Sequence, residues 1–236
     1  MAPDWVRVGS YVAQRRHELG LTQQDIAGRG GPSAATLRKL ELGQPKTAYD
    51  QGKLARLEKI LRWYHEIHGL RFVALRYFNA AGASERYGED HRIETHLIPN
   101  VLKVALGQRE NVQIFGTDYE TPDGTCIRDY IHIADLAQAH MLALHAQKSD
   151  YFNLGTGGGT SVREVIATCE RVTGKKIAVA EKPRRPGDPA RLIAASDKIQ
   201  RELGWKPKFQ SIDAIIESAW AWHVKNPNGY GDGAEG

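Results

Sequence analysis

Tyr49 and Lys53 are spaced so that together they could perform acid–base chemistry. Positions i and i+4 of a helix lie on one face, and a lysine ammonium beside a tyrosine lowers the pKa of the phenol. The phenolate can then act as a base. Residues 44–68 also fit a second interpretation, a helix with three leucines on one face that closes a small helical bundle. The residue types leave both interpretations open.

A glycine-rich stretch matches a dinucleotide-binding loop only in part. Gly155, Gly157 and Thr160 form G-x-G-x-x-T rather than the full fingerprint. No strand that ends in an acidic residue follows at the required offset. Ser161 and Glu164 instead predict a capping box, which begins a helix. We therefore expect a structural turn here and not a cofactor loop.

Histidines and cysteines give no sign of a metal centre or a disulfide framework. His132 and His140 have no third ligand at a spacing suited to a metal, so no metal site is predicted. Cys126 and Cys169 are the only cysteines, and both lie in segments expected to be buried. Free cysteine usually packs in the core, and so few cysteines suit a reducing cytoplasm.

Strands and helices must position any site, and their order indicates an α/β fold. Residues 72–78 form an apolar run of strand length, with Asn79 at its end, where open α/β sheets bind ligands. Residues 96–106 predict a helix and residues 112–115 a short strand. Asp135 is expected to be the N-cap of a further helix.

Positive charge is concentrated near the N-terminus. Residues 1–62 contain 11 Lys and Arg against 6 Asp and Glu, whereas the remaining residues contain 21 against 22. A basic module of this kind suggests an anionic partner, and an ordinary solvated helical surface explains it equally well. No apolar run approaches the roughly 18 residues of a membrane span, and MAPDWVRVGS is not a signal peptide, so we expect a cytoplasmic protein without a membrane partner.

The N-terminal segment LGLTQQDIA…PSAATLRKLELG resembles the repressor-type helix-turn-helix domains of bacterial regulators. Thr22 predicts an N-cap, with Asp25 three residues later, and a glycine–proline turn precedes a helix over residues 33–41. The resemblance implies an all-α module over residues 1–62 that binds duplex DNA. Its implied DNA contacts are Gln23, Ser33, Thr36, Arg38 and Lys39.

The rest of the chain resembles the C-terminal part of a UDP-glucose 4-epimerase, an extended short-chain dehydrogenase/reductase. RFVALRYFNAAGA at residues 71–83 and GTDYETPDGTCIRDYIHIADLAQAH at residues 116–140 carry this resemblance. It implies a Rossmann-like fold with a truncated parallel sheet and a small α/β substrate domain over residues 63–225, followed by a disordered tail at residues 226–236.

The resemblance also implies roles for individual residues. Tyr49 and Lys53 would be catalytic and would contact NAD, with Phe78 near the nicotinamide. The implied UDP-sugar contacts are Asn79, Leu97, Phe115, Arg128, Arg185 and Asp188. A guanidinium suits the diphosphate because its fork matches phosphate oxygens.

Three functional interpretations remain. The first is an epimerase that interconverts UDP-glucose and UDP-galactose with NAD, impaired because the sequence has no G-x-x-G-x-x-G phosphate loop. The second is a DNA-binding regulator that senses UDP-sugars, and the third is a fusion product without function. A homodimer is compatible with all three.

Overall fold

The computed structural model describes residues 14, 16–18, 20, 22–28, 51–91 and 93–230. The chain divides into two compact units, residues 1–72 and residues 73–236. Among the described residues, no helix combines the length and the apolar character that a membrane crossing requires.

The first unit contains two described helices, α2 (Gln23–Gly28) and α4 (Gln51–His68). Thr22 caps α2 as predicted, because its hydroxyl accepts from the Asp25 amide at 3.0 Å while the Asp25 carboxylate accepts from the Thr22 amide at 2.7 Å. The chain leaves α4 through Gly69, whose φ of +65° favours glycine. The predicted helix over residues 33–41 lies outside the described residues.

The second unit is an α/β structure built on parallel strand pairs. β1 (Val73–Tyr77) pairs with β6 (Asp150–Leu154), and β2 (Asn79–Ala81) pairs with β5 (Tyr130–His132). β1 confirms the strand predicted at residues 72–78. The strand ends that carry Asn79 and Tyr130 therefore lie next to each other in the structure.

Two further strand pairings form the other end of this unit. β3 (Val112–Phe115), which confirms its predicted bounds, runs parallel to β8 (Val179–Lys182). The short β4 (Ile127–Arg128) lies between β7 (Thr160–Ser161) and β9 (Arg191–Leu192).

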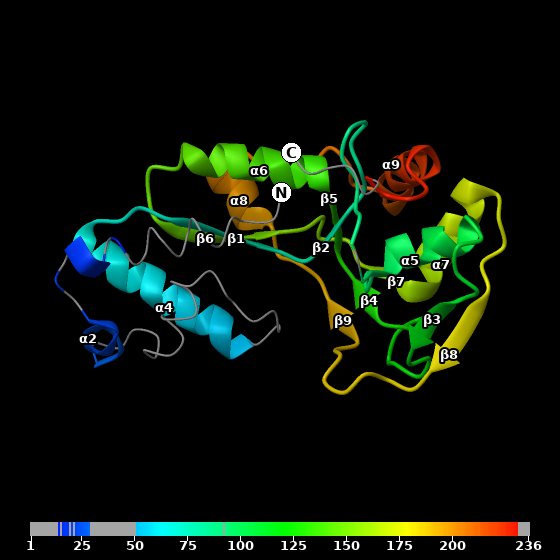
Figure 1. Cartoon of the computed structure of the whole chain (residues 1–236), viewed down its shortest axis with the longest axis horizontal. Coiled ribbons are helices and arrows are strands. Elements are labelled where there is room, and N and C mark those ends of the chain that lie inside the picture. The colour runs from blue at the N-terminus through cyan, green and yellow to red at the C-terminus, as the bar shows by residue number, and fades with distance from the viewer. Residues whose placement is uncertain are drawn as a thin grey trace. The chain divides into compact units, whose positions relative to one another are not determined.

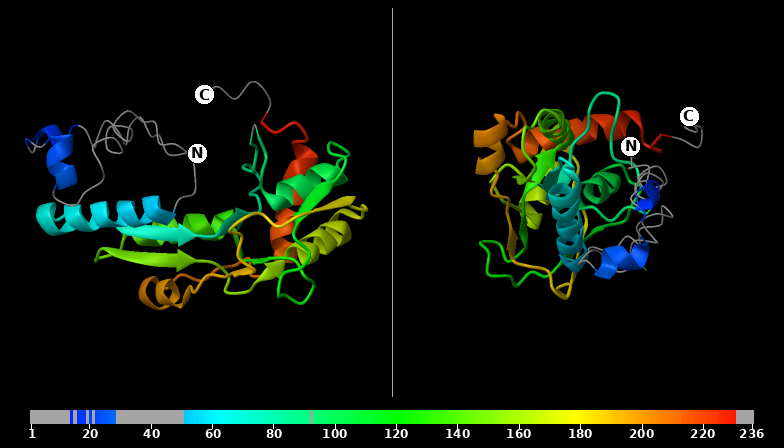
Figure 2. Two further views of the ribbon diagram at one scale, coloured as in Figure 1. Left: turned by 90° about the horizontal axis from the view of Figure 1, so that it is seen from below. Right: turned by 90° about the vertical axis from the view of Figure 1, so that its left-hand side faces the viewer.

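The helices gather in two groups around these strands (Figure 1). α6 (Ile133–Leu144) packs on β1, and α8 (Asp197–Leu203) packs on β6. α5, α7 and α9 pack on one another beside β3, and the left view of Figure 2 shows the same grouping from below. The bounds of this second group are α5 Leu97–Ala105, α7 Val162–Thr173 and α9 Ile212–Lys225.

Each group of helices encloses a hydrophobic cluster. Leu102, Ile114 and Ile216 are among the fully buried side chains around α5, α7 and α9. Leu154 and Trp205 are fully buried between β6, α6 and α8. α5 confirms the predicted helix, and its core contacts fix the position of its N-terminal turn.

Asp135 does not cap α6, so that prediction is wrong. His132 is the N-cap, and its Nδ1 accepts from the Ala134 amide at 3.0 Å. Asp135 lies one turn further on, where its buried carboxylate accepts from the amides of Lys208 and Phe209 at 2.8 and 3.0 Å. Asp135 therefore holds a loop that is distant in the sequence. The residues next to Asp135 give no indication of that contact.

Candidate functional site

A cavity of about 430 Å³ opens in the second unit, and all of the predicted UDP-sugar contacts line it. These residues are Asn79, Leu97, Phe115, Arg128, Arg185 and Asp188. They come from three strands, the start of one helix and the loop after β8, so the fold brings together residues that are more than 100 positions apart.

Asn79 lies where β1 gives way to β2. Its backbone amide and its side-chain Nδ2 both donate to the Asp129 carbonyl oxygen, at 3.1 and 2.8 Å. This double contact fixes the orientation of the Asn79 side chain. Parallel pairing of Asn79 with Tyr130 places the residue at the cavity wall.

Arg128 and Asp188 form an ion pair on the cavity wall. Their side chains are 12% and 26% exposed, so water screens the pair only partly. Arg128 also donates to the Ile127 carbonyl oxygen at 2.8 Å, which restrains the position of the guanidinium. A partly buried guanidinium in a fixed position is suited to bind an anion.

The loop after β8 is held by two consecutive arginines. Arg185 places its guanidinium carbon 3.9 Å from the centre of the Phe115 ring. Arg184 donates to the Asp118 carboxylate at 2.6 Å. Gly116 permits this close packing, because a Cβ there would lie 2.6 Å from the Arg184 Cγ. The loop therefore presents Arg185 and Asp188 at defined positions.

Polar residues that the sequence analysis did not single out complete the wall. Asn100 lies on the buried face of α5, and its Oδ1 accepts from Arg109 at 2.6 Å. Gln113 of β3 also lines the cavity. A polar residue within the apolar run LIPNVLKVAL was the available signal, because a buried amide requires a partner.

Two ionisable groups of the cavity lining, Cys126 and Tyr130, are uncharged at neutral pH. Burial raises the pKa of the Cys126 thiol, and burial also raises the pKa of the Tyr130 phenol. Both groups line the cavity in their protonated forms at neutral pH. Neither the thiol nor the phenol is activated as a nucleophile.

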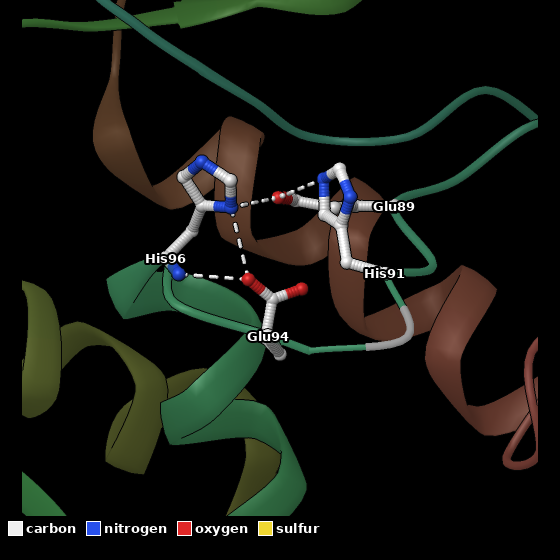
Figure 3. Close-up of side chains that lie close together, drawn as sticks. All are labelled: Glu89, His91, Glu94 and His96. Atoms are coloured by element: carbon white, nitrogen blue, oxygen red, sulfur yellow. Dashed lines mark hydrogen bonds and ion pairs between the residues drawn. The ribbon is translucent and has the colours of Figure 1, made fainter. Parts of the chain in front are cut away.

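A group of histidines and glutamates forms the rim before α5 (Figure 3). His96 Nδ1 lies 2.7 Å from Glu89 Oε1 and 2.9 Å from Glu94 Oε1. These two hydrogen bonds raise the pKa of His96 to about 10, against a smaller opposing effect of burial. Burial opposes ionisation of Glu94, but its bonds to His96 outweigh that effect and lower its pKa.

Each of the remaining predicted residues either lies away from this cavity or falls outside the described part of the chain. Phe78 is half-buried between β1 and β2. Lys53 lies in the first part of α4, over residues 51–56, where the side chains are not described, and Gln23 is the first residue of α2. Tyr49, Ser33, Thr36, Arg38 and Lys39 lie outside the described residues.

The glycine-rich turn offers no cradle for a pyrophosphate. The Asp129 carboxylate already accepts from the amides of Thr156 and Gly157, at 2.9 and 3.1 Å. A Cβ at Gly155 would lie 2.5 Å from Asp129 Oδ2, so glycine is needed here to let the Asp129 carboxylate approach the backbone. Ser161 forms the predicted capping box at the start of α7. The amides of Thr156 and Gly157 are therefore already paired within the protein.

Several known proteins are similar to this chain over most of its length. Residues 39–218 match the family described as GDP-mannose 4,6 dehydratase. The chain is 54% identical over 207 residues to the UDP-glucose 4-epimerase of Halalkalibacterium halodurans, covering 85% of this chain and 62% of that protein. It is 47% identical over 209 residues to the UDP-glucose 4-epimerase of Lacticaseibacillus casei, covering 86% of this chain and 63% of that protein.

Solved structures agree with these relatives. UDP-glucose 4-epimerase from Bifidobacterium longum, in complex with NAD+ and UDP, superposes with a TM-score of 0.72 at 45% identity, over 80% of this chain and 56% of that one. The enzyme from Brucella ovis, in complex with NAD, gives a TM-score of 0.69 at 37% identity, over 90% of this chain and 74% of that one. The chain spans 62–63% of the length of the curated enzymes from Halalkalibacterium halodurans and Lacticaseibacillus casei. By sequence and by fold, the chain belongs to the UDP-glucose 4-epimerase family.

Proposed function

We propose that this chain binds a UDP-sugar in the cavity of its second unit, as part of the interconversion of UDP-glucose and UDP-galactose. One observation carries the proposal: the fold gathers all of the predicted UDP-sugar contacts around a single cavity. Relatives named UDP-glucose 4-epimerase, at 47–54% identity, support the choice of ligand.

The charges of the cavity suit a diphosphate. Arg128 and Arg185 contribute two positive charges to the lining, and Asp188 neutralises one of them in the free protein. A guanidinium binds phosphate through parallel N–H donors, and a partly buried one does so with little screening. We infer that the diphosphate lies between these arginines.

The apolar part of the lining suits the nucleoside. Phe115 and Leu97 lie on the wall beside polar Asn100 and Gln113. A planar base packs on apolar and aromatic surface while amides satisfy its edge. This combination favours a nucleotide over a simple inorganic phosphate, which would leave the apolar wall in water.

NAD belongs to the proposal through the solved relatives that bind it. NAD accepts and returns the hydride in such a reaction, and Tyr49 with Lys53 would supply the base. No G-x-x-G-x-x-G loop occurs in the sequence. We therefore propose that the chain by itself binds UDP-sugars but holds NAD weakly and turns over little substrate.

Calorimetric titration of the full chain with UDP-glucose tests the proposal. We expect one site, with UDP bound almost as well and uridine bound far more weakly, because uridine lacks the diphosphate. Equal binding of uridine and UDP, or no binding of either, would contradict it. A coupled assay with UDP-galactose, with and without added NAD, then measures turnover, and Tyr49→Phe tests the predicted base.

A second proposal concerns the N-terminal module. The reciprocally capped α2 and the excess of positive charge support it. We propose that residues 1–62 bind duplex DNA weakly, with a steep loss of affinity as salt rises, because binding releases counterions. Fluorescence anisotropy of the full chain across a salt series measures this. The Arg38→Ala/Lys39→Ala variant should bind more weakly, and equal binding would reduce the effect to unspecific attraction.

A further inference from the structure

Four potential metal ligands lie together in the segment before α5, in the pattern Glu-x-His-x-x-Glu-x-His. Their donor atoms, one from each of Glu89, His91, Glu94 and His96, all lie within 4.8 Å of one another. Figure 3 shows that Glu89 approaches both imidazole rings, while Glu94 lies below His96. These residues are distinct from His132 and His140, the two histidines weighed as metal ligands from the sequence.

An unsatisfied oxygen gives the group a second distinguishing feature. The Glu94 side chain is only 4% exposed, yet its Oε2 has no hydrogen-bond partner among the described residues. Its other oxygen accepts from the His96 amide at 2.7 Å and contacts His96 Nδ1. Figure 3 shows Oε2 directed away from His96. A buried carboxylate oxygen without a donor is costly, and a cation removes that cost.

We propose that Glu89, His91, Glu94 and His96 bind one divalent transition-metal ion, with zinc as the best fit. Two imidazoles and two carboxylates form a mixed N/O set, which suits zinc and its neighbours better than magnesium or calcium. Donor atoms of a tetrahedral zinc site lie about 3.4 Å apart, given Zn–N and Zn–O bonds of about 2.1 Å.

The present geometry is close to that arrangement. Glu89 Oε1 lies 2.7 Å from His96 Nδ1 and 3.3 Å from His91 Nε2. The side chains of His91 and His96 are 52% and 56% exposed, so both can rotate slightly without disturbing the core. Zinc would replace the proton that His96 Nδ1 shares with the two carboxylates.

The position of the group gives the ion a role beyond the proposed function. Glu89, Glu94 and His96 line the cavity, and the segment that carries them leads directly into α5. A bound ion would tie this segment into one conformation and add positive charge to the cavity rim. Zinc binding needs no nucleotide, so it is measured independently of UDP-sugar binding.

Calorimetric titration of the full chain with zinc chloride, after chelator treatment and removal of any affinity tag, tests the proposal. We expect one zinc ion per chain and much weaker binding of magnesium. Glu94→Gln and His91→Ala should each weaken zinc binding roughly tenfold or more. His145→Ala is the matched control, because His145 is exposed at the end of α6, and it should bind zinc like the parent.

His91→Ala keeps the test decisive if Glu94→Gln does not fold, because the exposed His91 ring contributes little to the core. Circular dichroism establishes the fold of each variant. Absence of zinc binding near one ion per chain would overturn the proposal. Unchanged zinc affinity in His91→Ala or in a folded Glu94→Gln would do the same, as would magnesium binding as tight as that of zinc.

Discussion

Replacing Arg128 with glutamine is expected to weaken UDP binding by roughly 10- to 150-fold. Arg128 is partly buried and fixed by the Ile127 carbonyl, so it meets the diphosphate without reorganisation. A hydrogen bond to a charged group contributes about 1.5–3 kcal/mol, which gives that range of dissociation constants. Glutamine preserves most of the side-chain volume and removes the charge.

Asp188 makes the prediction sharper. In Arg128→Gln, the Asp188 carboxylate loses its partner and faces an anionic ligand across the cavity. Such a repulsion is worth at least about 1 kcal/mol, the value for two charges about 4 Å apart in water, which is roughly fivefold or more in affinity. The double variant Arg128→Gln/Asp188→Asn should therefore bind UDP better than Arg128→Gln alone.

Isothermal titration calorimetry with UDP at constant ionic strength measures all three proteins, and thermal unfolding establishes that each is folded. Arg163→Gln is the matched control, because Arg163 also forms an arginine–carboxylate pair, with Glu181, but away from the cavity. Binding by a folded Arg128→Gln within twofold of the parent would refute the reasoning. A double variant weaker than the single one would refute the account of Asp188.

Three further outcomes are expected. Gly82→Ala should destabilise the fold by roughly 2 kcal/mol or more in urea unfolding, because φ is +82° and the added Cβ would lie 2.4 Å from His132 Cδ2. Burial lowers the pKa of His132, and the attraction of Asp135 opposes this effect. The unfolded chain therefore takes up a proton at His132 more readily than the folded protein, and the free energy of unfolding should decrease as pH falls below about 6.5, the pKa of an unfolded histidine. His132→Asn, which keeps a helix cap, should show a shallower fall between pH 6.5 and 5, and parallel curves would contradict this. Cys126 and Cys169 should resist thiol labelling in the folded protein, since burial raises the pKa of both and that of Cys169 to about 12, and rapid native labelling would show the thiols to be accessible.

Local patterns in the sequence predicted several of the helices and strands, whereas the residues expected at the candidate site came from the family resemblance. An apolar run ending in Asn79 predicted β1 and the position of that residue, because strand ends and turns are determined by nearby residue types. Ser161 and Glu164 predicted the start of α7, since a capping box acts within one turn. The loop with Arg185 and Asp188 could be placed because the resemblance was continuous there.

Interactions between distant segments were decided by the tertiary structure alone. The pairing of Arg128 with Asp188, 60 residues away, depends on how β4 and the loop after β8 approach each other. Asp135 was misjudged for the same reason, because its partners lie 73 and 74 residues further along the chain. A sequence shows which groups need partners, whereas packing determines which partner is within reach, since a hydrogen bond or ion pair requires contact at about 3 Å.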